Sequence, residues 1–113
     1  MNNQPRTLER KRDFRRFNIN TDCMVSDIYE KYDTPNGAVV YGLELNDHEL
    51  ENKTFDSRYG FVILLENNHF LFRDIIDVTP TNIILKNRKD IQQEVLHRNE
   101  VKSYFKIETR EYF

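Results

Sequence analysis

The most apolar run of the chain, YGFVILL at residues 59–65, constrains the fold more than any other stretch. A short apolar run bounded by polar turn residues is typical of a buried strand. The pair Asn67-Asn68 follows it, and asparagine tolerates the positive φ that a tight hairpin turn requires. We therefore predict a central hairpin between this run and the segment HFLFRDIIDV at residues 69–78.

Other short β-prone segments alternate with turn residues along the chain. In Ala38–Leu45 the odd positions, Val39 to Leu45, share one face of an alternating strand, and Cys23–Tyr29 is its predicted partner across the turn TPNG. Two further turns, at residues 79–82 and 87–90, lead into IILK and IQQEVLH. The polar stretch 46–58 is predicted as a long loop that can hold a short turn of helix.

The end of the chain fits two alternatives. Asn99 can cap a helix that places Val101, Phe105 and Tyr112 roughly on one face, or VKSYFKI can form an alternating edge strand, followed by an irregular or helical tail. We favour the strand. Together the segments predict an all-β fold, a small antiparallel β-barrel of about six strands with room for a short C-terminal helix. The expected core residues are Val39, Leu43, Phe61, Ile63, Phe72, Ile75 and Ile84.

Charge divides the 113 residues unevenly. Residues 1–17 hold six Lys or Arg against two acids, a charge of +4. Because the net charge of the chain is −2, residues 18–113 carry a charge of −6. We expect a flexible tail over residues 1–8 and one barrel domain with a basic N-terminal arm over 9–113. Such an arm can rest on its acidic body until a stronger anion competes for it, although a solvated tail gives the same arithmetic.

Cysteine content and hydropathy point to a cytoplasmic protein. Cys23 is the single cysteine, so neither an intrachain disulfide nor a thiolate metal cluster can form within one chain. No run of about 18 apolar residues exists, and the N-terminus is too polar for a signal peptide, so membrane insertion is not expected.

The basic arm ERKRDFRRF, residues 9–17, is the strongest functional signal. Its five cations are Arg10, Lys11, Arg12, Arg15 and Arg16. A guanidinium can hold a phosphate through two hydrogen bonds, so several on one short segment suit a nucleotide or a nucleic-acid backbone. The alternative is that the run has no ligand, because basic runs at a chain terminus are commonly just exposed to solvent.

Catalytic signatures are few. The chain has no phosphate loop and no nucleophile elbow, and its three glycines exclude a glycine-rich cradle. The histidines His48, His69 and His97 are not linked by a motif to the acids of the polar loop. We therefore predict a non-catalytic binding module with no metal or cofactor.

The arm followed by a strand resembles the entry to a PilZ domain, a bacterial module that binds cyclic-di-GMP. Arg12 and Arg16 match its RxxxR motif, and Lys11 and Arg15 form a second register. The resemblance implies a small barrel with the arm as ligand clamp.

The second motif of the family, [DN]xSxxG, is absent, because Gly42, Glu44 and Asp47 occupy its three positions. The resemblance places Glu44 in the ligand site, where its carboxylate would repel an anion. The resemblance is therefore also compatible with another hypothesis, a divergent family member that acts as an adaptor and has lost the ligand.

Two other hypotheses come from the strand pattern. The run from Phe70 to Tyr104 also looks like a small Sm-like or SH3-like barrel, whose arm would bind nucleic-acid phosphates or a protein partner. The third is an adaptor protein of bacterial or phage machinery that uses exposed strand edges for its contacts.

Overall fold

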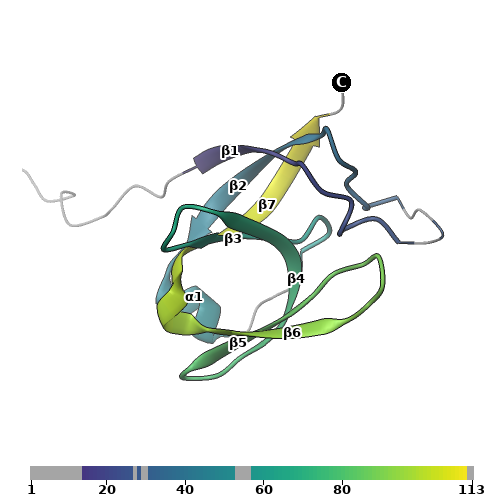
Figure 1. The fold of residues 1–113 in the computed structure, drawn as a ribbon. Coiled ribbons are helices and arrows are strands. Elements are labelled where there is room, and N and C mark those ends of the chain that lie inside the picture. The colour runs from purple at the N-terminus through teal and green to yellow at the C-terminus, as the bar shows by residue number, and fades with distance from the viewer. Residues whose placement is uncertain (1–13, 27, 29–30, 53–56, 112–113) are drawn as a thin grey trace, which may run out of the picture.

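A computed structural model describes residues 14–26, 28, 31–52 and 57–111. The elements are β1 (Phe14–Asn18), β2 (Val39–Leu45), α1 (Asp47–Glu51), β3 (Phe61–Leu65), β4 (Phe70–Val78), β5 (Asn82–Lys86), β6 (Gln93–His97), the 3-10 helix η2 (Arg98–Glu100) and β7 (Val101–Glu111). The described strands form one seven-stranded antiparallel sheet in the order β1-β2-β7-β3-β4-β5-β6 (Figure 1). The prediction of an antiparallel all-β fold is confirmed.

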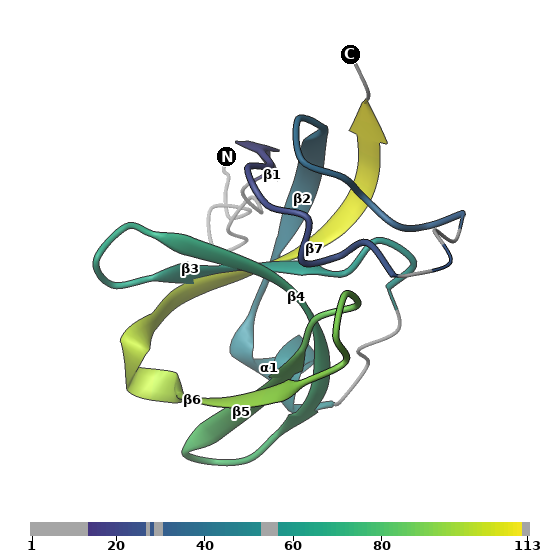
Figure 2. The same ribbon diagram turned by 45° about the vertical axis from the view of Figure 1, so that its right-hand side comes forward.

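The predicted barrel of about six strands does not close among the described residues, and the sheet has seven strands. β7 pairs with β2 on one side and with β3 on the other, and β1 and β6 are the two edges of the described sheet. The sheet curls at β4 and carries the β5–β6 hairpin across from β3 (Figure 2). An ion pair between Arg73 of β4 and Glu94 of β6 links the two ends of this curl without strand pairing.

The central hairpin is confirmed as β3–β4, in a register from Phe61↔Arg73 to Leu64↔Phe70. Asn68 in its turn has a φ of 69°, the left-handed conformation expected for an asparagine turn. The turn at residues 79–82 is confirmed too, since the Thr79 N–H donates to the carbonyl of Asn82 at 2.8 Å. Turn chemistry therefore sets the register of both hairpins.

The predicted strand Cys23–Tyr29 is wrong. β2 pairs instead with β1, the end of the basic arm, from Phe14↔Leu43 to Asn18↔Val39. Among the described residues of the predicted strand, 23–26 and 28 are irregular. Their polar groups have other partners: the Asp33 carboxylate accepts the backbone and hydroxyl hydrogens of Ser26 at 2.9 and 2.7 Å.

The C-terminal helix alternative is wrong for the described residues. Residues 98–100 form η2, and residues 101–111 form β7, the longest strand of the sheet. β7 has a hydrogen-bonding neighbour on each side, and Phe105 and Ile107 are buried along it. Tertiary pairing on both edges thus decides an end that the local sequence leaves ambiguous.

The turn of helix predicted in the polar loop is present as α1. Asn46 caps it, because its Oδ1 accepts the Glu49 N–H at 2.8 Å while Glu49 Oε1 accepts the Asn46 N–H at 3.0 Å. Leu50 is buried and anchors α1 inside the curl of the sheet (Figure 1). None of the described helices has the length and apolar character of a membrane span.

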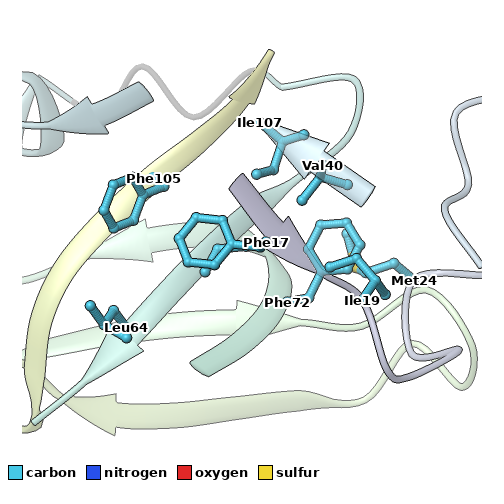
Figure 3. Packing of buried hydrophobic residues seen from close by; sticks show 9 residues of the cluster. Phe17, Ile19, Met24, Val40, Leu64, Phe72, Phe105 and Ile107 are labelled. Atoms are coloured by element: carbon cyan, nitrogen blue, oxygen red, sulfur yellow. The ribbon is translucent and has the colours of Figure 1, made fainter. Parts of the chain in front are cut away.

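β3 is buried on both faces, which accounts for its continuous apolar sequence. Val62 and Leu64 face a first cluster, shown in Figure 3 and composed of Phe17, Ile19, Met24, Val40, Val62, Leu64, Phe72, Phe105 and Ile107. Phe61 and Ile63 face a second cluster composed of Leu50, Phe61, Ile63, Ile75, Val78, Ile83, Leu85 and Tyr104. The segment at residues 17–24 covers one face, and α1 with β5 covers the other.

Five of the seven predicted core residues are buried: Val39, Phe61, Ile63, Phe72 and Ile75. Leu43 and Ile84 are only partly buried and belong to neither apolar cluster. The neighbours of Ile84 along β5, Ile83 and Leu85, point inward instead, which turns Ile84 to the outer face.

We predict that Phe61→Ala lowers the free energy of unfolding by about 3–5 kcal/mol, because the fully buried ring leaves a cavity between β3 and α1–β5. Phe14→Ala is the matched control, with a side chain that is 54% exposed and an expected cost of about 1 kcal/mol or less. Urea denaturation of both variants measures the difference. Equal midpoints would contradict the burial of Phe61.

Candidate functional site

The structure describes the end of the basic arm as an edge strand. Arg15 and Arg16 lie in β1, whereas Arg10, Lys11 and Arg12 lie outside the described residues. Successive side chains of a strand point to opposite faces, so Arg15 and Arg16 project from opposite faces of the sheet. Within the described part, these two cations do not converge on one anion.

Arg15 and Glu44 share one face of the sheet. Arg15 pairs with Gly42 in the register of β1 and β2, and its guanidinium carbon lies 5.2 Å from the centre of the Phe105 ring. Gly42 is required at this place, because a Cβ there would meet the Phe105 Cβ at 2.9 Å. Glu44 is two residues further along β2 and pairs with Phe105. The structure therefore brings together Arg15 and Glu44 and leaves Arg16 on the other face.

Arg16 lies beside an aromatic pair. In the β1–β2 register it is opposite Tyr41, whose ring stacks on that of Phe14 at 6.4 Å between centroids. The Tyr41 hydroxyl donates to Glu111 Oε1 at 3.0 Å. This face places Arg16 beside two aromatic rings, but the Glu111 carboxylate is hydrogen-bonded to one of them.

A second cluster of charges surrounds Arg88, in the turn after β5. Its Nε and one terminal nitrogen donate to the two oxygens of Asp74, both at 2.9 Å, which is the paired geometry typical of an arginine–carboxylate bridge. The remaining N–H groups reach Asp33 Oδ1 at 3.4 Å and the carbonyls of Tyr32 and Arg58 at 2.9 and 3.0 Å. All five donors of this guanidinium are thus occupied.

The electrostatics of Arg88 follow from these contacts. Burial lowers its pKa, but the hydrogen bond and charge of Asp74, together with those of Asp33, outweigh burial and raise the pKa above its usual value. Asp33 itself is only 2% exposed and also accepts two hydrogen bonds from Ser26. Arg88 therefore neutralises two carboxylates and joins the loop at residues 31–34 to β4.

Arg110 of β7 holds the same loop from the other side. Its guanidinium donates to the carbonyls of Lys31 and Asp33 and to the Thr34 hydroxyl, the last at 3.1 Å. Its carbon also lies 4.6 Å from the centre of the Tyr59 ring. Two arginines, one in the turn after β5 and one in β7, thus fix a loop that has no strand partner of its own among the described residues.

A pocket of about 330 Å³ opens beside Arg88. Its lining consists of Ser26, Tyr32, Asp33, Arg58, Asp74, Lys86, Arg88 and Ile91. The centre of the Tyr32 ring lies 5.4 Å from the Arg58 guanidinium carbon, 5.5 Å from the Lys31 nitrogen and 5.6 Å from the centre of the Tyr59 ring. Cations and tyrosine rings therefore gather at one rim.

The chemistry of this pocket is that of an anion site. Arg58 and Lys86 have no ion-pair partner in the described part of the chain, whereas both carboxylates of the lining are bonded to Arg88. The lining contains neither histidine nor cysteine. Across the described residues, no group of three or more His, Cys, Asp or Glu side chains is arranged to hold a metal ion.

Comparison of the chain with protein-family models, with curated proteins and with solved structures finds no match. The likeness of the arm to a PilZ entry therefore stays a prediction.

Sequence reasoning did not single out the residues of this pocket. Tyr32, Arg58, Lys86 and Arg88 come from three separate segments, and none of them belongs to a motif. The turn at residues 87–90 was predicted, but an arginine in a turn gives no periodic signal. Only the fold brings Asp33 and Arg88 within hydrogen-bonding distance.

We predict that Arg88→Met lowers the free energy of unfolding by about 3 kcal/mol, because it leaves Asp33 and Asp74 without their cation. Lys89→Met removes the same charge from the next residue, which is exposed, and should change stability by about 0.5 kcal/mol or less. Guanidinium denaturation of the two variants provides the comparison. A similar small loss for both would show that the network is not needed for folding.

Ile91, at the pocket lining, has a φ of 53° and is 70% exposed. A β-branched residue in the left-handed region is strained by about 1–2 kcal/mol, whereas asparagine adopts that region more readily. We expect Ile91→Asn to raise the thermal midpoint. Ile91→Val, which keeps the β-branch, should not raise it, and a lower midpoint for the asparagine variant would contradict the strain.

Proposed function

We propose that this chain is a non-catalytic module that binds single-stranded nucleic acid, with one nucleotide held in the pocket beside Arg88. The observation that carries the proposal is the surplus of positive charge there. Arg58 and Lys86 line the pocket without a carboxylate partner among the described residues, while Asp33 and Asp74 are bonded to Arg88. A phosphodiester that enters the pocket can therefore bind cations that form no ion pair with a described carboxylate.

The two cations suit a phosphate in different ways. The guanidinium of Arg58 is exposed and offers a planar fork of donors, and the ammonium of Lys86 adds a compact charge from β5. Lys31 contributes a third cation at the rim, 5.5 Å from the Tyr32 ring. Because the carboxylates of the lining are already neutralised, their repulsion of a phosphate is reduced.

The tyrosines support a nucleotide rather than a simple anion. The Tyr32 ring is covered by cations in the free protein, and a ring that holds a cation also stacks on a nucleobase. A base can take the place of Arg58 on this ring, and the displaced guanidinium is then free to bind the adjoining phosphate. Ring and cation thus exchange partners on binding.

The size of the pocket favours a single-stranded nucleic acid over a cyclic dinucleotide as the ligand. Its volume of about 330 Å³ is at the lower end for ligand sites, enough for one nucleotide unit but not for enclosing two. Cyclic-di-GMP, the ligand implied by the PilZ resemblance, also depends on a second motif that the sequence lacks, and Glu44 shares the face of Arg15. The arm cations add long-range attraction for a polyanion.

The test is a titration of the full chain with a fluorescent single-stranded oligonucleotide, read by anisotropy at several salt concentrations, and with cyclic-di-GMP, read by calorimetry. We expect salt-dependent binding of the oligonucleotide and no heat from cyclic-di-GMP. Arg58→Met or Lys86→Met should weaken binding by about tenfold or more, because each removes a charge-assisted contact of roughly 1.5–3 kcal/mol. Each should also flatten the salt dependence by about one unit.

Lys102→Met is the matched control. Lys102 is exposed on β7, reaches Asn68 at 3.4 Å and does not line the pocket, so the same loss of charge should leave affinity nearly unchanged. An equal loss in all three variants would indicate non-specific attraction and reject the pocket. Cyclic-di-GMP binding that Arg16→Ala abolishes would establish the arm as a PilZ-type clamp. Silence in both titrations would leave the protein-adaptor hypothesis.

A further inference from the structure

Strand β6 is an open edge of the sheet. In the described part of the chain it pairs with β5 alone, and Gln93, Glu94, Val95 and His97 are exposed. It contains neither lysine nor proline, the residues that commonly protect an edge from pairing with another chain. Its central residue, Val95, is 66% exposed. An edge that lacks lysine and proline and has an apolar centre is suited to strand addition.

The hydrogen-bonding pattern shows which groups this edge offers. The Arg98 N–H donates to the Thr81 carbonyl at 2.8 Å, which makes these residues a bonded pair next to the pair Asn82↔His97. Bonding alternates along an antiparallel ladder, so Leu96 and Glu94 also direct their backbone groups to β5. The N–H groups of His97, Val95 and Gln93 therefore point away from the sheet, to the free edge.

We propose that two copies of this chain associate edge to edge through antiparallel β6 strands, around a two-fold axis at Val95. In this register the Val95 N–H of each copy donates to the Val95 carbonyl of the other. The His97 N–H of each copy likewise donates to the Gln93 carbonyl of the other. Symmetry makes each bond twice, as in a closed isologous interface. The proposal does not rest on nucleic-acid binding.

The side chains of β6 match a second copy better than an arbitrary strand. Along the outer face the order is Gln93, Val95, His97, which is polar, apolar and polar and so reads the same in both directions. The two-fold places valine on valine and amide beside imidazole. The one acidic residue, Glu94, points to the other face and is held by Arg73, so no carboxylates oppose each other at the axis.

The neighbouring strand extends this apolar contact. Ile84 of β5 pairs with Val95 and lies on the same outer face, partly exposed. Next to it, β4 is irregular between Ile75 and Asp77, and Ile76 is 40% exposed. A single strand pair with these flanking residues is smaller than a standard interface, so the expected dimer is weak and concentration-dependent.

Sedimentation equilibrium of the full chain over a wide concentration range tests the proposal, with an expected rise from the mass of one chain towards that of two. Val95→Pro should weaken association by about tenfold or more, because it removes the central donors. It breaks no bond to β5, since the Val95 N–H points outward. Val95→Thr keeps the N–H and the β-branch and should still dimerise.

Val95→Lys is a second disrupting variant, which places like charges at the axis and does not depend on how β6 tolerates proline. Circular dichroism of each variant verifies the fold. A wild-type chain that stays monomeric at every concentration overturns the proposal. So does a dimer that neither the proline nor the lysine variant weakens, because it would use a different surface.

Discussion

The structure depends on the burial of β3 on both faces. Residues 61–64 alternate between two apolar clusters, so each face of this strand needs its own cover. Leaving either face in water would cost about 25 cal/mol for each Å² of apolar surface. The segment at residues 17–24 and the curled layer of α1 and β5 are the two covers, and the other elements connect or support them.

The loop at residues 31–34, which borders the first cover at Met24, is held by polar contacts rather than by strand pairing. Residues 31–34 have no ladder of their own, and their carbonyls accept hydrogen bonds from Arg88, in the turn after β5, and from Arg110 of β7. This arrangement ties the rim of the pocket to the sheet. Functional groups on a loop that is fixed in this way keep their positions without belonging to a strand. The same arginines that complete the fold thus place Tyr32 and Arg58.

Local chemistry in the sequence was enough to predict the hairpins but not their assembly. Asn68 and the turn at residues 79–82 act within a few residues, so β3–β4 and β4–β5 were predictable. The pairing of β1 with β2 spans an irregular segment with its own β-prone residues, and nothing local distinguishes Phe14–Asn18 from Cys23–Tyr29. The sequence did not predict how the sheet is assembled for a similar reason, because β2 and β3, the two partners of β7, are distant from it in sequence. The pocket depends on such long-range contacts, so the sequence alone indicated only the basic arm as a binding site.

The position of β7 has a consequence for how the protein is made. Of the described strands it comes last in the sequence, yet it lies between β2 and β3 and is the one described strand that links them in the sheet. Until residues 101–111 emerge from the ribosome, the β1–β2 hairpin and the β3–β6 meander have no shared ladder. The two halves can therefore share a ladder only once β7 is available, and such a non-local pairing forms more slowly than a hairpin. A long-range pairing, rather than any local turn, thus makes the sheet one structure.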